Sequence, residues 1–112
     1  MKTTPPVKLE PSHETTSLLV CPHCGDTQLH QERVRTFFPD LAFAETGEGT
    51  AVYSSHGEVM IDRDMEDNPS YVRAGMTVHF DCEGCREPSG LAIYQHKGQT
   101  MVKWLPLGTT RY

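Results

Sequence analysis

The sequence lacks any long hydrophobic run. None of its 112 residues belongs to a stretch approaching the ~18 consecutive apolar residues of a membrane-spanning helix. The first 20 residues also lack the apolar stretch of a secretion signal, because Pro5, Pro6 and Pro11 interrupt them. We therefore expect no membrane association and a cytoplasmic setting, where thiols stay reduced.

Apolar material is also scarce. Hydrophobic residues make up 37% of the chain, and there is one tryptophan. A chain of this length fits one small domain, which buries only a modest core. A metal or disulfide staple would therefore contribute a large share of its stability.

Positive charge is underrepresented, since the formal net charge is −5. The segment from Asp40 to Asp67 contains more than half of the acidic residues, and Arg63 is its one basic residue. Its acidic residues are Asp40, Glu45, Glu48, Glu58, Asp62, Asp64, Glu66 and Asp67. An acidic chain gains no general attraction to a phosphate backbone. The charge favours a protein over a nucleic acid as the partner and leaves a local basic patch open.

Cysteine is rare, but every cysteine belongs to a C-x-x-C pair. The pairs are Cys21 with Cys24 and Cys82 with Cys85. Two such turns supply the four soft ligands of a tetrahedral zinc site. Gly25 follows the first pair, so the backbone there can turn closely past a metal. The spacing predicts one structural Zn²⁺ held by four cysteines, although iron uses similar turns.

The first pair, CPHC, has a redox interpretation as well. A thioredoxin-type dithiol lies at the N-terminus of a helix that follows a buried strand. Here Cys24 is followed by GDTQLHQERV, which has no helical stripe, and the second pair would have no role. A thiol-disulfide oxidoreductase and a pair of disulfides are the weaker alternatives. Because four thiolates leave zinc no open position, we expect no metal catalysis and no enzyme.

Alternating apolar residues predict a mainly β fold. Polar, proline-rich residues 1–17 predict a flexible tail, residues 18–106 the domain with an acidic insert at about 40–70, and residues 107–112 a second tail. The expected elements are a strand over 28–37, a helical turn within 39–45, a hairpin over 51–61, a strand over 76–81 and a hairpin over 91–104. His56-Gly57 and Lys97-Gly98 occupy the two expected hairpin turns.

The segments CPHCG and VHFDCEGC, each next to an expected strand, resemble the zinc-ribbon family. More loosely, the chain is similar to small uncharacterised zinc-ribbon proteins of bacteria and their mobile elements. The resemblance covers residues 18–37 and 76–105 and implies two knuckles on β-hairpins that clamp one zinc, with an inserted β segment. It implies a fold but no activity. Two departures are the long insert between the knuckles and Arg86, which stands where a knuckle glycine often follows the second cysteine.

Two functions stay open beside the redox alternative. The first is a protein-binding module, a small regulator or adaptor, and the acidity favours it. The second is a nucleic-acid-binding ribbon that uses phosphate contacts and base stacking. Its candidate residues are Arg33, Arg35, Lys97 and Lys103, with Tyr94 and Trp104 nearby. Trp104 fits a core position equally well, and we expect His23 to point away from the metal.

Overall fold

The computed structural model describes residues 4–106 and is mainly β, as the sequence predicts. Nothing described is a helix long and apolar enough to cross a membrane. The elements are β1 (Leu9–His13), β2 (Thr16–Leu19), β3 (Leu29–Pro39), α1 (Phe43–Thr46), β4 (Gly49–Ser55), β5 (Glu58–Asp62), β6 (Gly75–Cys82), β7 (Pro88–His96) and β8 (Gln99–Trp104).

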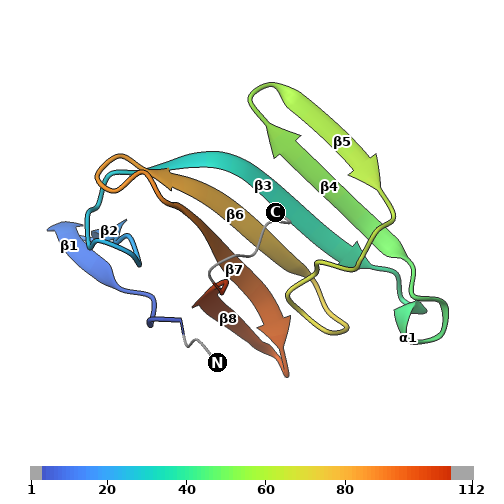
Figure 1. Ribbon diagram of the computed structural model, residues 1–112. Coiled ribbons are helices and arrows are strands. Elements are labelled where there is room, and N and C mark those ends of the chain that lie inside the picture. The colour runs from blue at the N-terminus through green and yellow to red at the C-terminus, as the bar shows by residue number, and fades with distance from the viewer. Residues whose placement is uncertain (1–3, 107–112) are drawn as a thin grey trace.

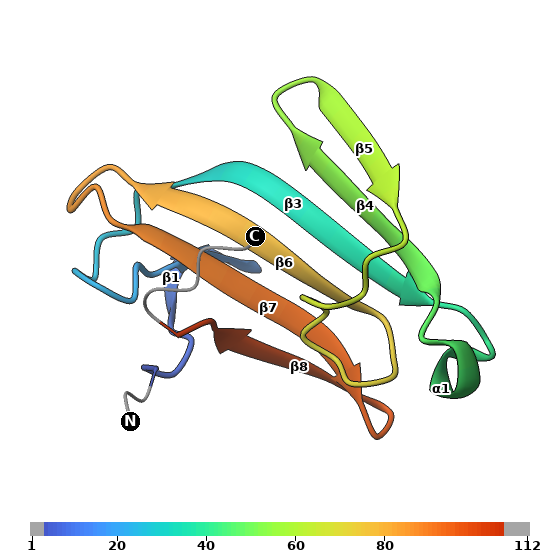
Figure 2. The ribbon, with the colours of Figure 1, turned by 45° about the vertical axis from the view of Figure 1, so that its right-hand side comes forward.

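Six strands form one antiparallel sheet in the order β5-β4-β3-β6-β7-β8 (Figure 1 and Figure 2). The insert between the knuckles supplies β4 and β5, which extend the sheet beyond β3. Both expected hairpin turns are present, and each has two successive residues at positive φ: His56 and Gly57 at 36° and 87°, Lys97 and Gly98 at 49° and 79°. Such dihedrals match the twist of a two-residue hairpin.

The core lies on one side of the sheet, which we call the apolar face. Val78, Leu91 and Trp104 are paired neighbours on β6, β7 and β8, so their side chains share this face. All three are buried, and Trp104 is only 2% exposed. From the N-terminal part of the chain, Val7 and Leu19 pack against this cluster and cover it. Trp104 is therefore a core residue.

The opposite side, which we call the loop face, is covered by residues 63–74. Asp67 of this loop lies 3.2 Å from Arg35 of β3, and the Ser70 hydroxyl donates to the Gln95 carbonyl at 2.8 Å. Phe37 beneath the loop is fully buried. The two faces therefore have different covers, an N-terminal segment on one and an internal loop on the other.

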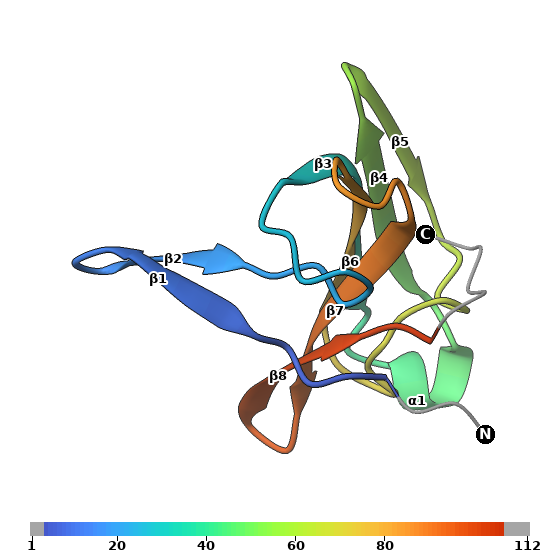
Figure 3. The ribbon, with the colours of Figure 1, turned by 60° about the vertical axis from the view of Figure 1, so that its left-hand side comes forward.

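Within residues 1–17, where the sequence predicts a flexible tail and no strand, the structure contains β1 and the start of β2. These strands pair as a separate hairpin, which Figure 3 shows projecting away from the larger sheet. All residues of β1 are exposed, so the sequence there carries no alternation to reveal a strand. The expected tail over 107–112 lies outside the described residues, and the domain boundaries stay a prediction.

Candidate metal centre

The four cysteines come together at one end of the sheet. Cys21 and Cys24 lie in the turn between β2 and β3, while Cys82 ends β6 and Cys85 lies in the turn before β7. Their Sγ atoms all lie within 4.8 Å of one another. The Sγ atoms of Cys21 and Cys85 are 3.9 Å apart, and those of Cys24 and Cys82 are 3.6 Å apart. Four sulfurs at ~2.3 Å from a tetrahedral zinc would be about 3.8 Å apart, so this donor set fits the ion.

Both knuckles have the same backbone turn. In the first, the Gly25 amide donates to the Cys21 carbonyl at 3.0 Å, and in the second the Arg86 amide donates to the Cys82 carbonyl at 2.9 Å. Gly25 has a φ of 81° and Arg86 a φ of 62°. Arg86 therefore adopts the left-handed conformation that glycine adopts without steric cost.

Backbone amides point at the sulfurs and favour their anionic form. The His23 amide lies 3.4 Å from the Cys21 Sγ. In the second knuckle, the amides of Cys85 and Gly84 lower the pKa of the Cys82 thiol to about 7. Donation to a thiolate stabilises its charge, so these amides prepare the site for a cation.

The thiols of Cys85 and Cys24 hold their protons more firmly in the absence of a metal. For Cys85, the Glu87 amide lowers the pKa, but desolvation and the neighbouring cysteine thiols outweigh it and raise the pKa to about 12. For Cys24, the Asp26 amide is likewise outweighed by desolvation and the Cys82 thiol, so its pKa is also raised. Four thiolates in such proximity would repel one another, and either protonation or a bound cation relieves that repulsion.

The knuckles are also linked through their backbones and through His23. The Glu83 amide donates to the Gln28 carbonyl at 2.9 Å. The His23 ring nitrogen Nε2 lies 3.0 Å from the Pro88 carbonyl oxygen. His23 therefore contacts the start of β7 rather than joining the sulfur cluster, as expected.

Asp26 is a supporting residue that the sequence reasoning missed. Its carbonyl accepts from the Cys21 amide at 2.7 Å, and its carboxylate accepts from the Gln28 amide at 3.1 Å. A Cβ at Gly84 would meet the Asp26 carboxylate, so a larger residue there would force the Asp26 side chain to shift. The sequence signal was an Asp directly after the knuckle, a residue that commonly bonds to the backbone two residues on.

The donor set is closed and unevenly buried. Cys21 and Cys82 are buried, Cys85 is partly buried and Cys24 is exposed. Within residues 4–106, no His, Asp or Glu joins these four cysteines as a fifth donor. One side of the cluster therefore belongs to the core, and the other faces solvent.

Two candidate nucleic-acid-binding residues are already engaged within the protein. Arg35 forms the ion pair with Asp67, and its side chain is only 14% exposed. Arg33 donates to the Nδ1 atom of buried His79 at 2.7 Å. Burial lowers the pKa of His79, and the Arg33 charge lowers it further, so the ring is neutral and can accept.

The other two candidates lie on the β7–β8 hairpin. Lys103 stands over the Tyr94 ring, with its Nζ 5.3 Å from the ring centroid. Lys97 occupies the exposed turn. Two intervening strands, β6 and β7, separate Lys103 from Arg35, so the four cations do not form one cluster.

Comparison of the chain with protein-family models, curated proteins and solved structures finds no match. The class of site is a cluster of four cysteines at the end of an antiparallel sheet.

Proposed function

We propose that Cys21, Cys24, Cys82 and Cys85 bind one structural Zn²⁺, and that the domain is a small protein-binding module of the zinc-ribbon type. The observation that carries the proposal is the sulfur cluster, whose separations of 3.6 and 3.9 Å between the two knuckles suit tetrahedral zinc. Zinc would join a knuckle before β3 to a knuckle between β6 and β7, and so stabilise a fold with a small core.

A structural role fits the closed donor set better than a catalytic one. With four thiolates bound, zinc has no open position for water or substrate. Two of the donors are buried, which ties the metal to the core. The domain then acts by presenting surfaces, and not by chemistry at the metal.

The arrangement also disfavours a redox dithiol. Each cysteine of CPHC lies beside a cysteine of the second knuckle, Cys24 at 3.6 Å from Cys82 and Cys21 at 3.9 Å from Cys85. A β-strand follows CPHC in place of the helix whose N-terminus would lower a thiol pKa.

The choice of a protein over a nucleic acid rests on charge. The acidic segment around β4 and β5 would repel a phosphate backbone. Arg33 and Arg35, two of the four candidate cations, already have partners within the protein. Lys97 and Lys103 alone are few for tight phosphate binding.

Two measurements test the proposal. Elemental analysis of protein purified without added metal, with a native free-thiol count, should find one zinc per chain and no fast-reacting thiol. A chain without metal and with two reactive thiols would contradict the metal site. In a salt titration with DNA and RNA, we expect no binding at low salt, and steeply salt-dependent binding would refute the choice of a protein partner.

A further inference from the structure

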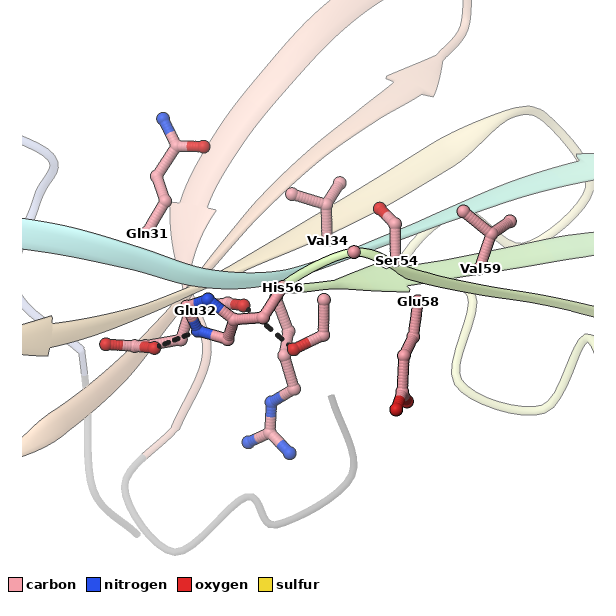
Figure 4. A pocket seen from close by; sticks show the side chains of 10 residues that line it. Gln31, Glu32, Val34, Ser54, His56, Glu58 and Val59 are labelled. Carbon is pink, nitrogen blue, oxygen red and sulfur yellow. Dashed lines mark hydrogen bonds and ion pairs between the residues drawn. The ribbon is translucent and has the colours of Figure 1, made fainter.

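The apolar face continues beyond the core onto β4 and β5. In one row across the strands, Val78 pairs with Val34, Val34 with Ser54, and Ser54 with Val59. Paired residues share a face, and Figure 4 shows Val34, Ser54 and Val59 on the same side of the ribbon. The row of paired residues that begins in the core at β6 therefore continues to the edge strand β5.

At this end of the sheet the apolar face has no cover among the described residues. Val59 is 66% exposed, Ile61 69% and Phe38 57%. A hollow of about 320 Å³ adjoins the β4–β5 turn, and both Val34 and Val59 line it. Clustered apolar exposure of this kind marks an interaction surface.

The strand β5 is also an open edge. It pairs with β4 on one side, and all five of its residues are exposed. In a two-residue hairpin, the residues flanking the turn form a hydrogen-bonded pair, and hydrogen-bonded and non-hydrogen-bonded pairs then alternate along the ladder. Val59 and Ile61 belong to non-hydrogen-bonded pairs with β4, so their N–H and C=O groups point away from β4. Such groups are a template for a further strand.

Contacts with β3 fix the β4–β5 turn in the absence of a partner. His56 in the turn lies 2.7 Å from the Glu32 carboxylate, and the Ser55 hydroxyl donates to the Glu32 carbonyl at 3.2 Å (Figure 4). Glu32 is the extra residue at the irregularity of β3. A strand fixed in this way loses little conformational entropy on binding.

The acidic residues of β5 indicate the charge that a partner strand should carry. Glu58 and Asp62 flank the apolar centre of β5, and neither forms an ion pair with a base within residues 4–106. Both share the loop face of the strand with Met60, because alternate residues point the same way. An added strand is therefore favoured by basic residues opposite both ends and apolar residues opposite Val59 and Ile61.

A second copy of the chain does not meet this requirement at β5. Antiparallel pairing centred on Met60 would place Glu58 opposite Asp62 of the other copy, twice. In-register parallel pairing would place each acid opposite itself. Both arrangements oppose like charges, and each copy carries a net charge of −5.

We propose that β5 binds an extended segment of a partner protein as an additional strand, and that this segment has Lys or Arg at its first and fifth positions and apolar residues at its second and fourth. The inference rests on the proposed function, because it names the surface and the chemistry of the protein partner. The new strand would continue the apolar face over Val59 and Ile61.

The test uses zinc-loaded protein and one peptide, acetyl-Gly-Lys-Val-Thr-Val-Lys-Gly-amide, followed by NMR. We expect saturable amide shifts over Glu58–Asp62 and none on the other edge strand, β8. A peptide N-methylated at both valines should bind about tenfold more weakly or not at all, because it cannot complete the ladder. Equal binding of the N-methylated peptide would overturn strand addition.

Two variants test the stated chemistry. Ile61→Thr should weaken binding about threefold, while Val102→Thr, the matched change on β8, should leave it unchanged. Glu58→Lys should reverse the charge preference at one end, so that a peptide with Glu in place of one Lys binds better than the original. Loss of charge discrimination, or equal effects of the two threonine variants, would overturn the proposal.

The remaining outcomes separate this inference from the proposed function. Absence of shifts in β5 at about 1 mM peptide, with one zinc per chain intact, overturns the edge proposal and leaves the zinc-stabilised module standing. Concentration-dependent self-association through β5, seen by sedimentation, overturns the choice of occupant. Absence of zinc from the folded chain overturns the proposed function, whether or not the peptide binds.

Discussion

The two ends of the six-stranded sheet share one apolar face but differ in what covers it. At the β6–β8 end, Val78 is 7% exposed and the N-terminal segment packs over it. In the same row at the β5 end, Val59 is 66% exposed. The comparison shows that alternation in a strand marks a face for burial, while a separate segment decides whether it is buried.

The ends also differ in how they are held. The β6–β8 end carries the cysteine cluster and the Phe80–Trp104 edge-to-face contact, with ring centroids 6.2 Å apart. The β5 end is held by the β4 ladder and the exposed contact between the His56 ring and the Glu32 carboxylate. An exposed pair of this kind contributes roughly 0–1 kcal/mol. Changes at the two ends should therefore have very different effects.

The largest effect should come from Cys82→Ser, which removes a buried ligand. Structural zinc contributes an apparent binding free energy of about 10–16 kcal/mol. This is comparable to the whole ~5–15 kcal/mol stability of a typical domain, so the variant should lose zinc and unfold. Circular dichroism and zinc content measure this, with Val59→Ser as the control. A folded, metal-free Cys82→Ser protein would show that the metal is not the staple.

Acidification should weaken zinc binding at the β6–β8 end and leave the β5 end unaffected. Zinc binds thiolates, and the raised pKa of Cys24 and the pKa of about 12 for Cys85 mean that both carry protons at pH 7. Zinc must displace at least these two protons, so its apparent affinity should fall by about a hundredfold or more per pH unit as pH decreases.

Near pH 7 and below, the fall in zinc affinity should become steeper, because Cys82, with a pKa of about 7, also begins to take up a proton. Competition with a chromophoric chelator between pH 8 and pH 6 measures the slope. An affinity independent of pH would argue against thiolate ligation.

One substitution made at both ends sharpens the comparison directly. Val78→Ala should cost about 2–3 kcal/mol, because it opens a cavity in the core. Val59→Ala, in the same row, should cost about 0.5 kcal/mol or less. Urea denaturation of both variants measures the difference, and equal costs would mean that the β5 end is covered in solution.

The smallest effect concerns one backbone conformation at each end. Arg86→Gly should stabilise the protein by about 0.5 kcal/mol, because relief of left-handed strain slightly exceeds the added entropy of the unfolded chain. His56→Gly should be nearly neutral, because it relieves the same strain but removes the contact with the Glu32 carboxylate. Thermal melts distinguish the two, and destabilisation by Arg86→Gly would assign the Arg86 side chain a role in the fold.

Much of the fold was predictable where its causes are local. The turns at His56-Gly57 and Lys97-Gly98 depend on their own φ values, and the β3 and β6 patterns depend on alternation. The four cysteines were predictable as a set because two identical spacings leave no cysteine over, and the structure brings all four together. The β1–β2 hairpin was not predictable, since its exposed strands carry no pattern.

What the sequence by itself determined is the mainly β class, the two turns and the four candidate ligands, because each follows from residues a few positions apart. Tertiary structure alone decided that Arg35 pairs with Asp67, that His23 contacts the Pro88 carbonyl, and that β5 is an uncovered edge. These outcomes depend on how segments far apart in the chain pack together, and side-chain periodicity does not encode that packing.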